Sequence, residues 1–213
     1  MDKTSENFKD VLLDVNFYDQ IGEAKIAGLN KEWADRACGI ISLKMVLEYL
    51  AKEKISLKEI FKNLNGGKGY REGVGWILSD IVNFALSRDI SSWRRKFYLN
   101  EEEKDLFRKE GLDEKSIEKL DRQTEREGIS SIIEAINDGY PVMVSIPKHF
   151  RKGESGHLIV VTGFRRIDAG KMEIVGLYIN DPYPEDEEGK NIFIELNKFQ
   201  ESWNKRAIFF EKN

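Results

Sequence analysis

Cysteine is the rarest residue of this 213-residue chain, which contains only one, Cys38. A single cysteine cannot form a disulfide within the chain, which is typical of proteins in a reducing compartment. No apolar run is long enough to span a bilayer, and residues 1–6 lack the apolar segment of a signal peptide. These absences predict a soluble, cytoplasmic protein.

The excess of one charge over the other is also small. The chain has 34 Lys and Arg residues, 38 Asp and Glu residues and a formal net charge of −4. Binding to nucleic acid or to an anionic membrane normally needs a clear positive excess, so we expect neither as a partner. The length suits one domain over residues 1–213, with enough chain to bury a core without disulfides.

The segment that begins at Cys38 is the most informative part of the sequence. Residues 40–50 are apolar on nearly every side. The exceptions are Ser42 and the pair Lys44 and Glu48, whose i,i+4 spacing predicts one narrow solvent-facing stripe. This pattern predicts a helix buried in the core with Cys38 in its first turn. Free backbone N–H groups and the helix dipole stabilise a thiolate there, so Cys38 is a candidate nucleophile. The alternative is a small core residue.

Apolar spacing and capping signals predict two further helices, over residues 56–64 and 77–86. Residues 100–128 are mostly charged with a thin apolar edge, which predicts a solvated helical insertion. A mobile cover over a cleft is the alternative for this segment. Residues 131–137 predict a short helix that ends at Gly139.

The second half of the chain has the pattern of strands. A short strand is also expected within residues 11–20, followed by a connector over residues 21–36. The strands predicted after Gly139 cover residues 141–146, 157–164, 173–179, 192–196 and 207–210. The prediction is an α+β domain in which N-terminal helices, one of them central and buried, pack on a C-terminal antiparallel sheet.

A cysteine nucleophile needs a base, and the base needs a group that orients it. The chain offers two histidines. His149 lies in a polar loop and is expected to be an ordinary exposed residue. His157 opens an apolar strand, where the sheet would hold its ring at the edge of a cleft, although a structural role fits it equally well. Asp181 follows the next strand and would end at the same sheet edge, as a partner of His157 or as a simple loop cap.

Together these motifs resemble the C39-like group of papain-fold cysteine peptidases. The resemblance covers most of the chain except the charged stretch near residues 100–128. The residues that carry it are Trp33-Ala34-Asp35-Arg36-Ala37-Cys38-Gly39, Met45-Val46-Leu47, Gly75-Trp76, residues 139–144, residues 156–164, Asn180-Asp181-Pro182 and Trp203.

The resemblance implies a papain-like fold and a triad in which Cys38 is the nucleophile, His157 the general base and acid, and Asp181 the orienting group. It implies a peptide or protein substrate and neither a cofactor nor a metal. The expected activity is hydrolysis of peptide or amide bonds through a thioester. The alternatives are acyl transfer or deamidation by the same intermediate, and a non-catalytic papain-fold binding module.

The sequence departs from the family pattern at the oxyanion hole. Papain-fold enzymes typically have a glutamine six residues before the cysteine, where this chain has Glu32. The nearest glutamine is Gln20, which would reach the site only if residues 21–32 form an inserted loop. We expect Gln20 to supply the oxyanion donor and Glu32 to face solvent beside Lys31 and Arg36. Family members that process double-glycine leader peptides are usually fused to a transporter, and this sequence shows no transporter segment. The resemblance therefore supports the expected chemistry better than it supports a particular substrate.

Overall fold

The computed structural model describes residues 8–66, 69–169, 171–184 and 188–212, so the signal-peptide prediction for residues 1–6 lies outside it. The helices are α1 (Gln20–Ile26), α2 (Lys31–Arg36), α3 (Cys38–Ala51), α4 (Leu57–Gly66), α5 (Leu78–Leu86), α6 (Glu101–Lys109), α7 (Glu114–Asn137) and α8 (Leu196–Ser202). The strands are β1 (Phe8–Leu12), β2 (Tyr70–Arg71), β3 (Gly75–Trp76), β4 (Ile90–Lys96), β5 (Val142–Pro147), β6 (Gly156–Ala169), β7 (Lys171–Asn180), β8 (Ile192–Glu195) and β9 (Arg206–Lys212). No helix of the described residues combines the length and the apolar character needed to cross a membrane.

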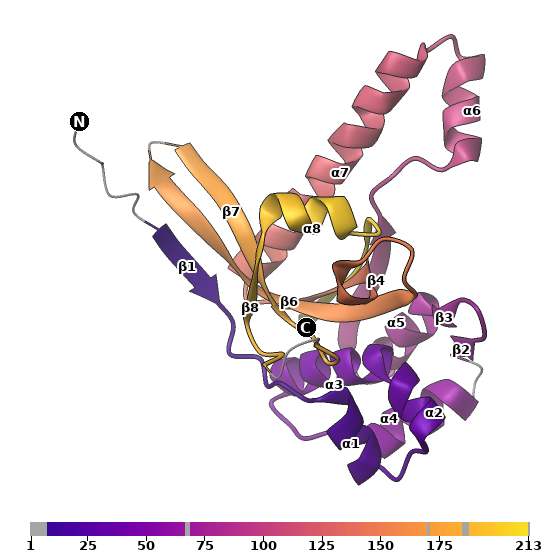
Figure 1. Cartoon of the computed structure of the whole chain (residues 1–213), viewed down its shortest axis with the longest axis vertical. Coiled ribbons are helices and arrows are strands. Elements are labelled where there is room, and N and C mark those ends of the chain that lie inside the picture. The colour runs from indigo at the N-terminus through magenta and orange to yellow at the C-terminus, as the bar shows by residue number, and fades with distance from the viewer. Residues whose placement is uncertain (1–7, 67–68, 170, 185–187, 213) are drawn as a thin grey trace.

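One antiparallel sheet dominates the second half of the chain (Figure 1). Its strand order is β4-β9-β5-β6-β7-β8, and β1 pairs with the distal part of β6. Strands β2 and β3 form a separate small hairpin. The α+β prediction is therefore confirmed, with helices in the first half of the chain and an antiparallel sheet in the second.

The two faces of the sheet bury two different hydrophobic cores. Side chains alternate between the faces of a strand, so Met143, Val160 and Ile208 pack with α3 and the neighbouring helices. Val144 and Val161 point the other way and pack with α7 and α8. Helix α3 is buried on nearly every side, as its sequence predicts.

The solvent-facing stripe predicted on α3 is wrong, because Lys44 and Glu48 are both buried. The segment before α1 covers them: the Tyr18 hydroxyl donates to Glu48 at 2.5 Å, and Glu23 of α1 lies 3.4 Å from Lys44. Lys44 also pairs with Glu48 at 2.9 Å. The two charges are therefore satisfied inside the protein and not by water.

Residues 11–36 also differ from the prediction. The first strand ends at Leu12, and the expected connector forms the short helices α1 and α2. Local capping explains both, because the side chains of Asp19 and Asn30 accept hydrogen bonds from the backbone N–H groups of Gly22 and Trp33.

Two further differences lie in the middle of the chain. The predicted helix over residues 131–137 is the end of the long α7, which continues through Gly128. A Cβ atom there would lie 2.5 Å from Phe97 and 2.6 Å from Trp203, so this glycine allows close packing and does not end the helix. Strand β4 was not predicted, because its second half consists of charged residues. Such charges are common on edge strands, and β4 is the first strand of the sheet order.

Candidate active site

Cys38 is the first residue of α3, directly after the turn that follows α2. The indole nitrogen of Trp76 donates a hydrogen bond to the carbonyl of Arg36 at 2.5 Å and so fixes this turn. A Cβ atom on residue 39 would lie 2.6 Å from the Trp76 ring, so only glycine lets this indole pack against the start of α3. The sequence Cys38-Gly39 and the distant Gly75-Trp76 therefore act as one structural unit.

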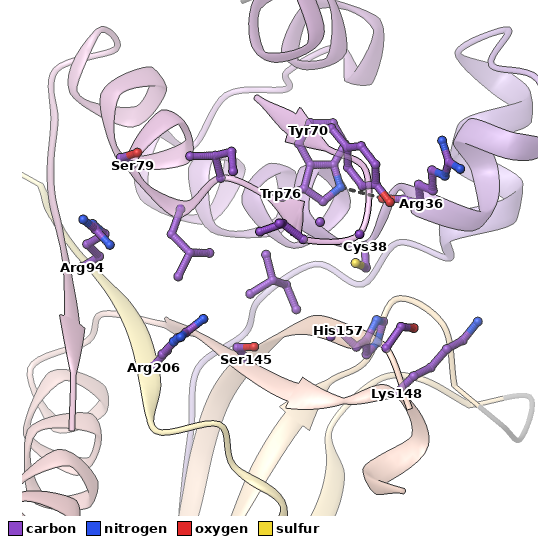
Figure 2. Close-up of a pocket in the computed structure, with 18 of the residues that line it drawn as sticks. Arg36, Cys38, Tyr70, Trp76, Ser79, Arg94, Ser145, Lys148, His157 and Arg206 are labelled. Atoms are coloured by element: carbon purple, nitrogen blue, oxygen red, sulfur yellow. Dashed lines mark hydrogen bonds between the residues drawn. The ribbon is translucent and has the colours of Figure 1, made fainter. Parts of the chain in front are cut away.

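His157 is the second residue of β6, and its neighbour Leu158 joins that strand to α3. The hydroxyl of Ser42 donates to the Leu158 carbonyl at 2.9 Å, which holds the helix against the strand. His157 is buried, and Figure 2 shows its ring directed toward Cys38 from the opposite side of the cleft.

Asp181 follows the end of β7, at the same edge of the sheet as His157. Its Oδ1 atom lies 2.6 Å from Nε2 of His157 and also accepts a hydrogen bond from the backbone N–H of Tyr183 at 2.9 Å. The backbone N–H of Asp181 donates to Gly189 at 2.8 Å, which fixes the loop. With Nε2 engaged by Asp181, the ring nitrogen that remains for Cys38 is Nδ1.

The interactions of this group shift two pKa values in opposite directions. Burial disfavours a charged His157, but its hydrogen bonds to Asp181 and Cys38 outweigh burial and raise its pKa to about 9. Burial also opposes the Cys38 thiolate, yet the hydrogen bond and positive charge of His157 bring the pKa of Cys38 below its usual value. At neutral pH these shifts favour a thiolate beside an imidazolium.

Gln20 reaches the same cleft as Cys38 although eighteen positions separate them in the sequence. It is the buried first residue of α1, and its backbone N–H donates to the Pro182 carbonyl at 2.8 Å. Its side-chain Nε2 donates to the Ala34 carbonyl at 2.6 Å, while Oε1 has no partner. An amide nitrogen carries two hydrogens, so one N–H remains for another acceptor.

Glu32 and His149 lie away from this group. The Glu32 carboxylate is exposed and pairs with Arg36 at 2.7 Å, as predicted from the sequence. His149 is half-buried, and not exposed as expected, because its ring lies against that of Tyr183 with 5.9 Å between the centroids. Neither residue lines the cleft.

The cleft has a volume of about 850 Å³ and extends well beyond Cys38. One wall comes from the β2–β3 hairpin and the start of α5, and the other from β4, β5, β6 and β9. Within the described residues, no cluster of His, Cys, Asp and Glu could hold a metal ion.

The sequence prediction assigned no contact at the site to several residues of this region, although Trp76 and Pro182 belong to motifs that carry the family resemblance. Trp76, Pro182 and Tyr183 act through one indole nitrogen, one carbonyl and one backbone N–H, and each contact depends on tertiary structure. The residues of β4 were missed with their strand. The sequence signals among these are Asn180-Asp181-Pro182 and Gly75-Trp76, and the role of the second became clear from its contact with Gly39.

Comparison with known proteins gives one family and several structures. The model of the Peptidase_C39 like family matches residues 12–207. A double glycine motif protease from an AMS/PCAT transporter, solved with its leader peptide, has 15% identity over 83% of this chain and 84% of its own, with a TM-score of 0.47. The peptidase domain of Streptococcus ComA has 18% identity over 84% of this chain and 93% of its own, with a TM-score of 0.49.

The peptidase domain of Streptococcus mutans ComA has 19% identity over 83% of this chain and 92% of its own, with a TM-score of 0.40. No curated protein sequence matches the chain. The family match includes every motif from Gln20 to Trp203 and confirms both the predicted resemblance and its papain-like fold: the chain belongs to the Peptidase_C39 like family.

Proposed function

We propose that this protein is a cysteine peptidase in which Cys38, His157 and Asp181 form a catalytic triad. The observation that carries the proposal is the position of His157, which contacts Asp181 through Nε2 at 2.6 Å and directs its ring toward Cys38 in the same cleft. Family membership supports the same chemistry. The opposite pKa shifts of His157 and Cys38 supply both a nucleophile and a proton donor at neutral pH.

In the first half of the reaction the Cys38 thiolate attacks the carbonyl carbon of the scissile bond. The carbonyl oxygen becomes negatively charged, and the tetrahedral intermediate then collapses to a thioester. The proton of the His157 imidazolium moves to the leaving amine, so that the first product departs neutral. Asp181 holds the imidazole in the orientation that this transfer needs.

In the second half His157 acts as the base. It takes a proton from a water molecule, which attacks the thioester and releases the acid product. The sulfur leaves as the thiolate, and the starting ion pair is restored. One balanced cycle therefore consumes one water per bond cleaved and requires no metal or cofactor.

The developing oxyanion needs hydrogen-bond donors. We assign this role to the backbone N–H at the start of α3 and to the free N–H of the Gln20 amide. Glu32 takes no part, because an ionised carboxylate would repel the oxyanion and its side chain is paired with Arg36 in solvent.

A peptide or protein is the substrate class that fits the open cleft of about 850 Å³ and the family. The test is incubation with an unbiased peptide mixture, read by mass spectrometry, with a Cys38→Ala variant as control. New peptide termini that appear only with the unaltered protein support the proposal. A mass gain of one unit indicates deamidation, a gain of an acyl group indicates acyl transfer, and unchanged peptides indicate a binding module; each would overturn hydrolysis.

A further inference from the structure

The end of the cleft farthest from Cys38 is cationic. Six Lys or Arg side chains line the cleft, against only two acids, in a chain whose formal net charge is −4. Figure 2 shows Arg94 and Arg206 together at the end of the cleft opposite Cys38. One of the acids, Glu72, pairs with Arg36 at 3.2 Å and so neutralises a cation elsewhere.

Strand pairing explains how the two arginines come together. Strands β4, β9, β5 and β6 are neighbours in that order, and Lys96 of β4 lies opposite Arg206 of β9. The pairing of Val144 with Ala207 brings Arg206 beside Ser145 of β5, which lies opposite Leu158 of β6. These residues form a row across the sheet.

Arg94 faces the same side of the sheet as this row, because it lies two residues before Lys96 on β4. Ile208, opposite Arg94, packs in the core around α3, so this is the face of the sheet that is covered by the helix of Cys38. The sheet therefore presents both arginines and the strand of His157 to one continuous cleft.

Both arginines are available for a ligand. Lys96, in contrast, is already paired with Glu103 of α6 at 2.5 Å. Arg206 donates to the uncharged hydroxyl of Tyr98 at 3.0 Å, and no ion pair joins it or Arg94 to an acid in the part of the chain that the structure describes. A guanidinium binds a carboxylate through two parallel hydrogen bonds, which is stronger than a contact with a neutral group.

We propose that Arg94 and Arg206 form a subsite for a carboxylate of the peptide substrate, an inference that rests on the peptidase function proposed above. The carboxylate comes from an Asp or Glu side chain or from the C-terminus of the peptide. Three strand-to-strand steps of about 4.8 Å separate β6 from β4, which is about 14 Å. An extended peptide covers this distance in roughly four residues.

The carboxylate therefore lies roughly three to five residues from the scissile bond. Trp76 and the residues that follow it, Ile77 and Leu78, line the same cleft. Figure 2 places Trp76 beside Cys38 and Ser79 toward Arg94, so this apolar segment lies along the substrate between the two ends. The subsite thus selects peptides with an apolar stretch between the cleaved bond and an acid.

The first test uses peptides derived from any sequence that the protein cleaves. Glu, Gln or Lys is placed singly at each position up to five residues on either side of the cleaved bond, with the C-terminus free or amidated. At one position we expect the kcat/KM of the Glu peptide to be about 5- to 10-fold higher than that of the Gln peptide. In the double variant Arg94→Gln/Arg206→Gln this ratio should fall toward one. An effect of the free C-terminus alone identifies the chain end as the carboxylate. The control Lys115→Gln changes an exposed cation outside the cleft and should keep the preference.

The second test measures binding without catalysis. The Cys38→Ala variant is titrated into labelled decapeptides that contain four Glu, four Gln or four Lys residues, and fluorescence anisotropy is recorded at low and high salt. Tighter binding of the Glu peptide, lost at high salt and in the double arginine variant, supports the subsite. Cleavage with no preference for Glu would overturn the subsite and leave the peptidase function intact. Tighter binding of the Glu peptide without cleavage of any peptide would overturn the peptidase function and leave the subsite intact. If the protein neither cleaves peptides nor prefers the Glu peptide, both proposals are overturned.

Discussion

Helix α3 carries an ionisable side chain near each end, and the two side chains differ in what surrounds them. At the first residue, Cys38 faces His157 across an open cleft and is only half-buried. Three turns later, Glu48 is buried and accepts hydrogen bonds from Tyr18, Ile55, Lys44 and Lys54. Burial disfavours the Glu48 carboxylate, but these donors outweigh burial and lower its pKa to about 2.

The comparison separates charge used for structure from charge used for chemistry. Every acceptor position of Glu48 is occupied, so the group has no capacity left for a substrate. The group around Cys38 keeps one open side, toward the cleft, and a Gln20 amide that is only partly bonded. Removing the Glu48 carboxylate should therefore lower the stability of the protein, and altering the group around Cys38 should lower its activity.

Replacing the proposed nucleophile, Cys38, gives the largest expected effect. Cys38→Ser should lower kcat/KM by at least about 10⁴-fold, because the hydroxyl is not ionised by the neighbouring imidazole. The free energy of unfolding should change by less than about 0.5 kcal/mol, since the two side chains have nearly the same shape. Peptide cleavage and urea denaturation measure the two quantities. A stable variant with full activity would remove Cys38 from the mechanism.

Glu48→Gln should have the opposite profile. Removing the charge leaves Lys44 buried beside a neutral amide, which should cost about 3 kcal/mol of unfolding free energy. Cleavage per folded molecule should stay within about 2-fold of the unaltered protein, since Glu48 does not line the cleft. Glu53→Gln, which alters an exposed carboxylate nearby, is the matched control. Equal losses of unfolding free energy in Glu48→Gln and Glu53→Gln would show that the buried interactions of Glu48 do not stabilise the protein.

The stability difference should also depend on pH. The pKa of Glu48 in the folded protein is about 2, below its ordinary value of 4.5. A depressed pKa stabilises the folded state above the unfolded value, and this contribution is lost as the pH falls from about 4.5 toward 2. The unfolding free energies of Glu48→Gln and the unaltered protein should therefore converge in that range.

Replacing the proposed oxyanion donor, Gln20, gives a smaller expected change in activity. Gln20→Ala should reduce kcat by about 10²- to 10³-fold, because it removes one positioned donor. Glu32→Ala should change kcat by less than about 2-fold, since its carboxylate lies in solvent. Both rates are read with one peptide under saturating conditions. If Glu32→Gln raised kcat strongly and Gln20→Ala had no effect, the donor position would be residue 32, six residues before the cysteine as in the family pattern, and the assignment of Gln20 would be wrong.

The same comparison explains what the sequence could predict. The apolar pattern of α3 is strong enough to predict a buried helix. The resemblance to C39-like peptidases implies that Cys38, His157 and Asp181 form one site. The burial of Lys44 and Glu48 was missed, because it depends on Tyr18 and Glu23 from another segment. Helices α1 and α2 have fewer than two turns each, which is too short for a periodic signal.

The cationic end of the cleft could not be predicted either. It depends on β4, whose charged residues form a strand only through pairing with β9, more than a hundred residues later. Strand formation is sensitive to such partners, and no local pattern specifies the register that sets Lys96 opposite Arg206. Motifs near one another on the central helix are thus more predictable than surfaces built across the sheet.

The smallest expected effect is a shift in the titration of Cys38, and it distinguishes an ion pair from a merely buried thiol. The hydrogen bond and charge of His157 lower the pKa of Cys38 against the effect of burial. Alkylation by iodoacetamide should therefore reach half its maximal rate well below the ~8.5 of a free cysteine. In His157→Ala burial remains and the imidazolium is lost, so the midpoint should rise by at least about one unit.

Peptide cleavage should follow a bell-shaped pH profile. Its acid limb reports the ionisation of Cys38, and its alkaline limb should lie near 9, where His157 loses the proton that the leaving amine needs. His149→Ala removes the other histidine, which lies outside the cleft, and should leave both the alkylation midpoint and the bell unchanged. An alkylation rate that rose only above pH 8 in the unaltered protein would place Cys38 with the buried, inert cysteines, and the two ends of α3 would then both be structural.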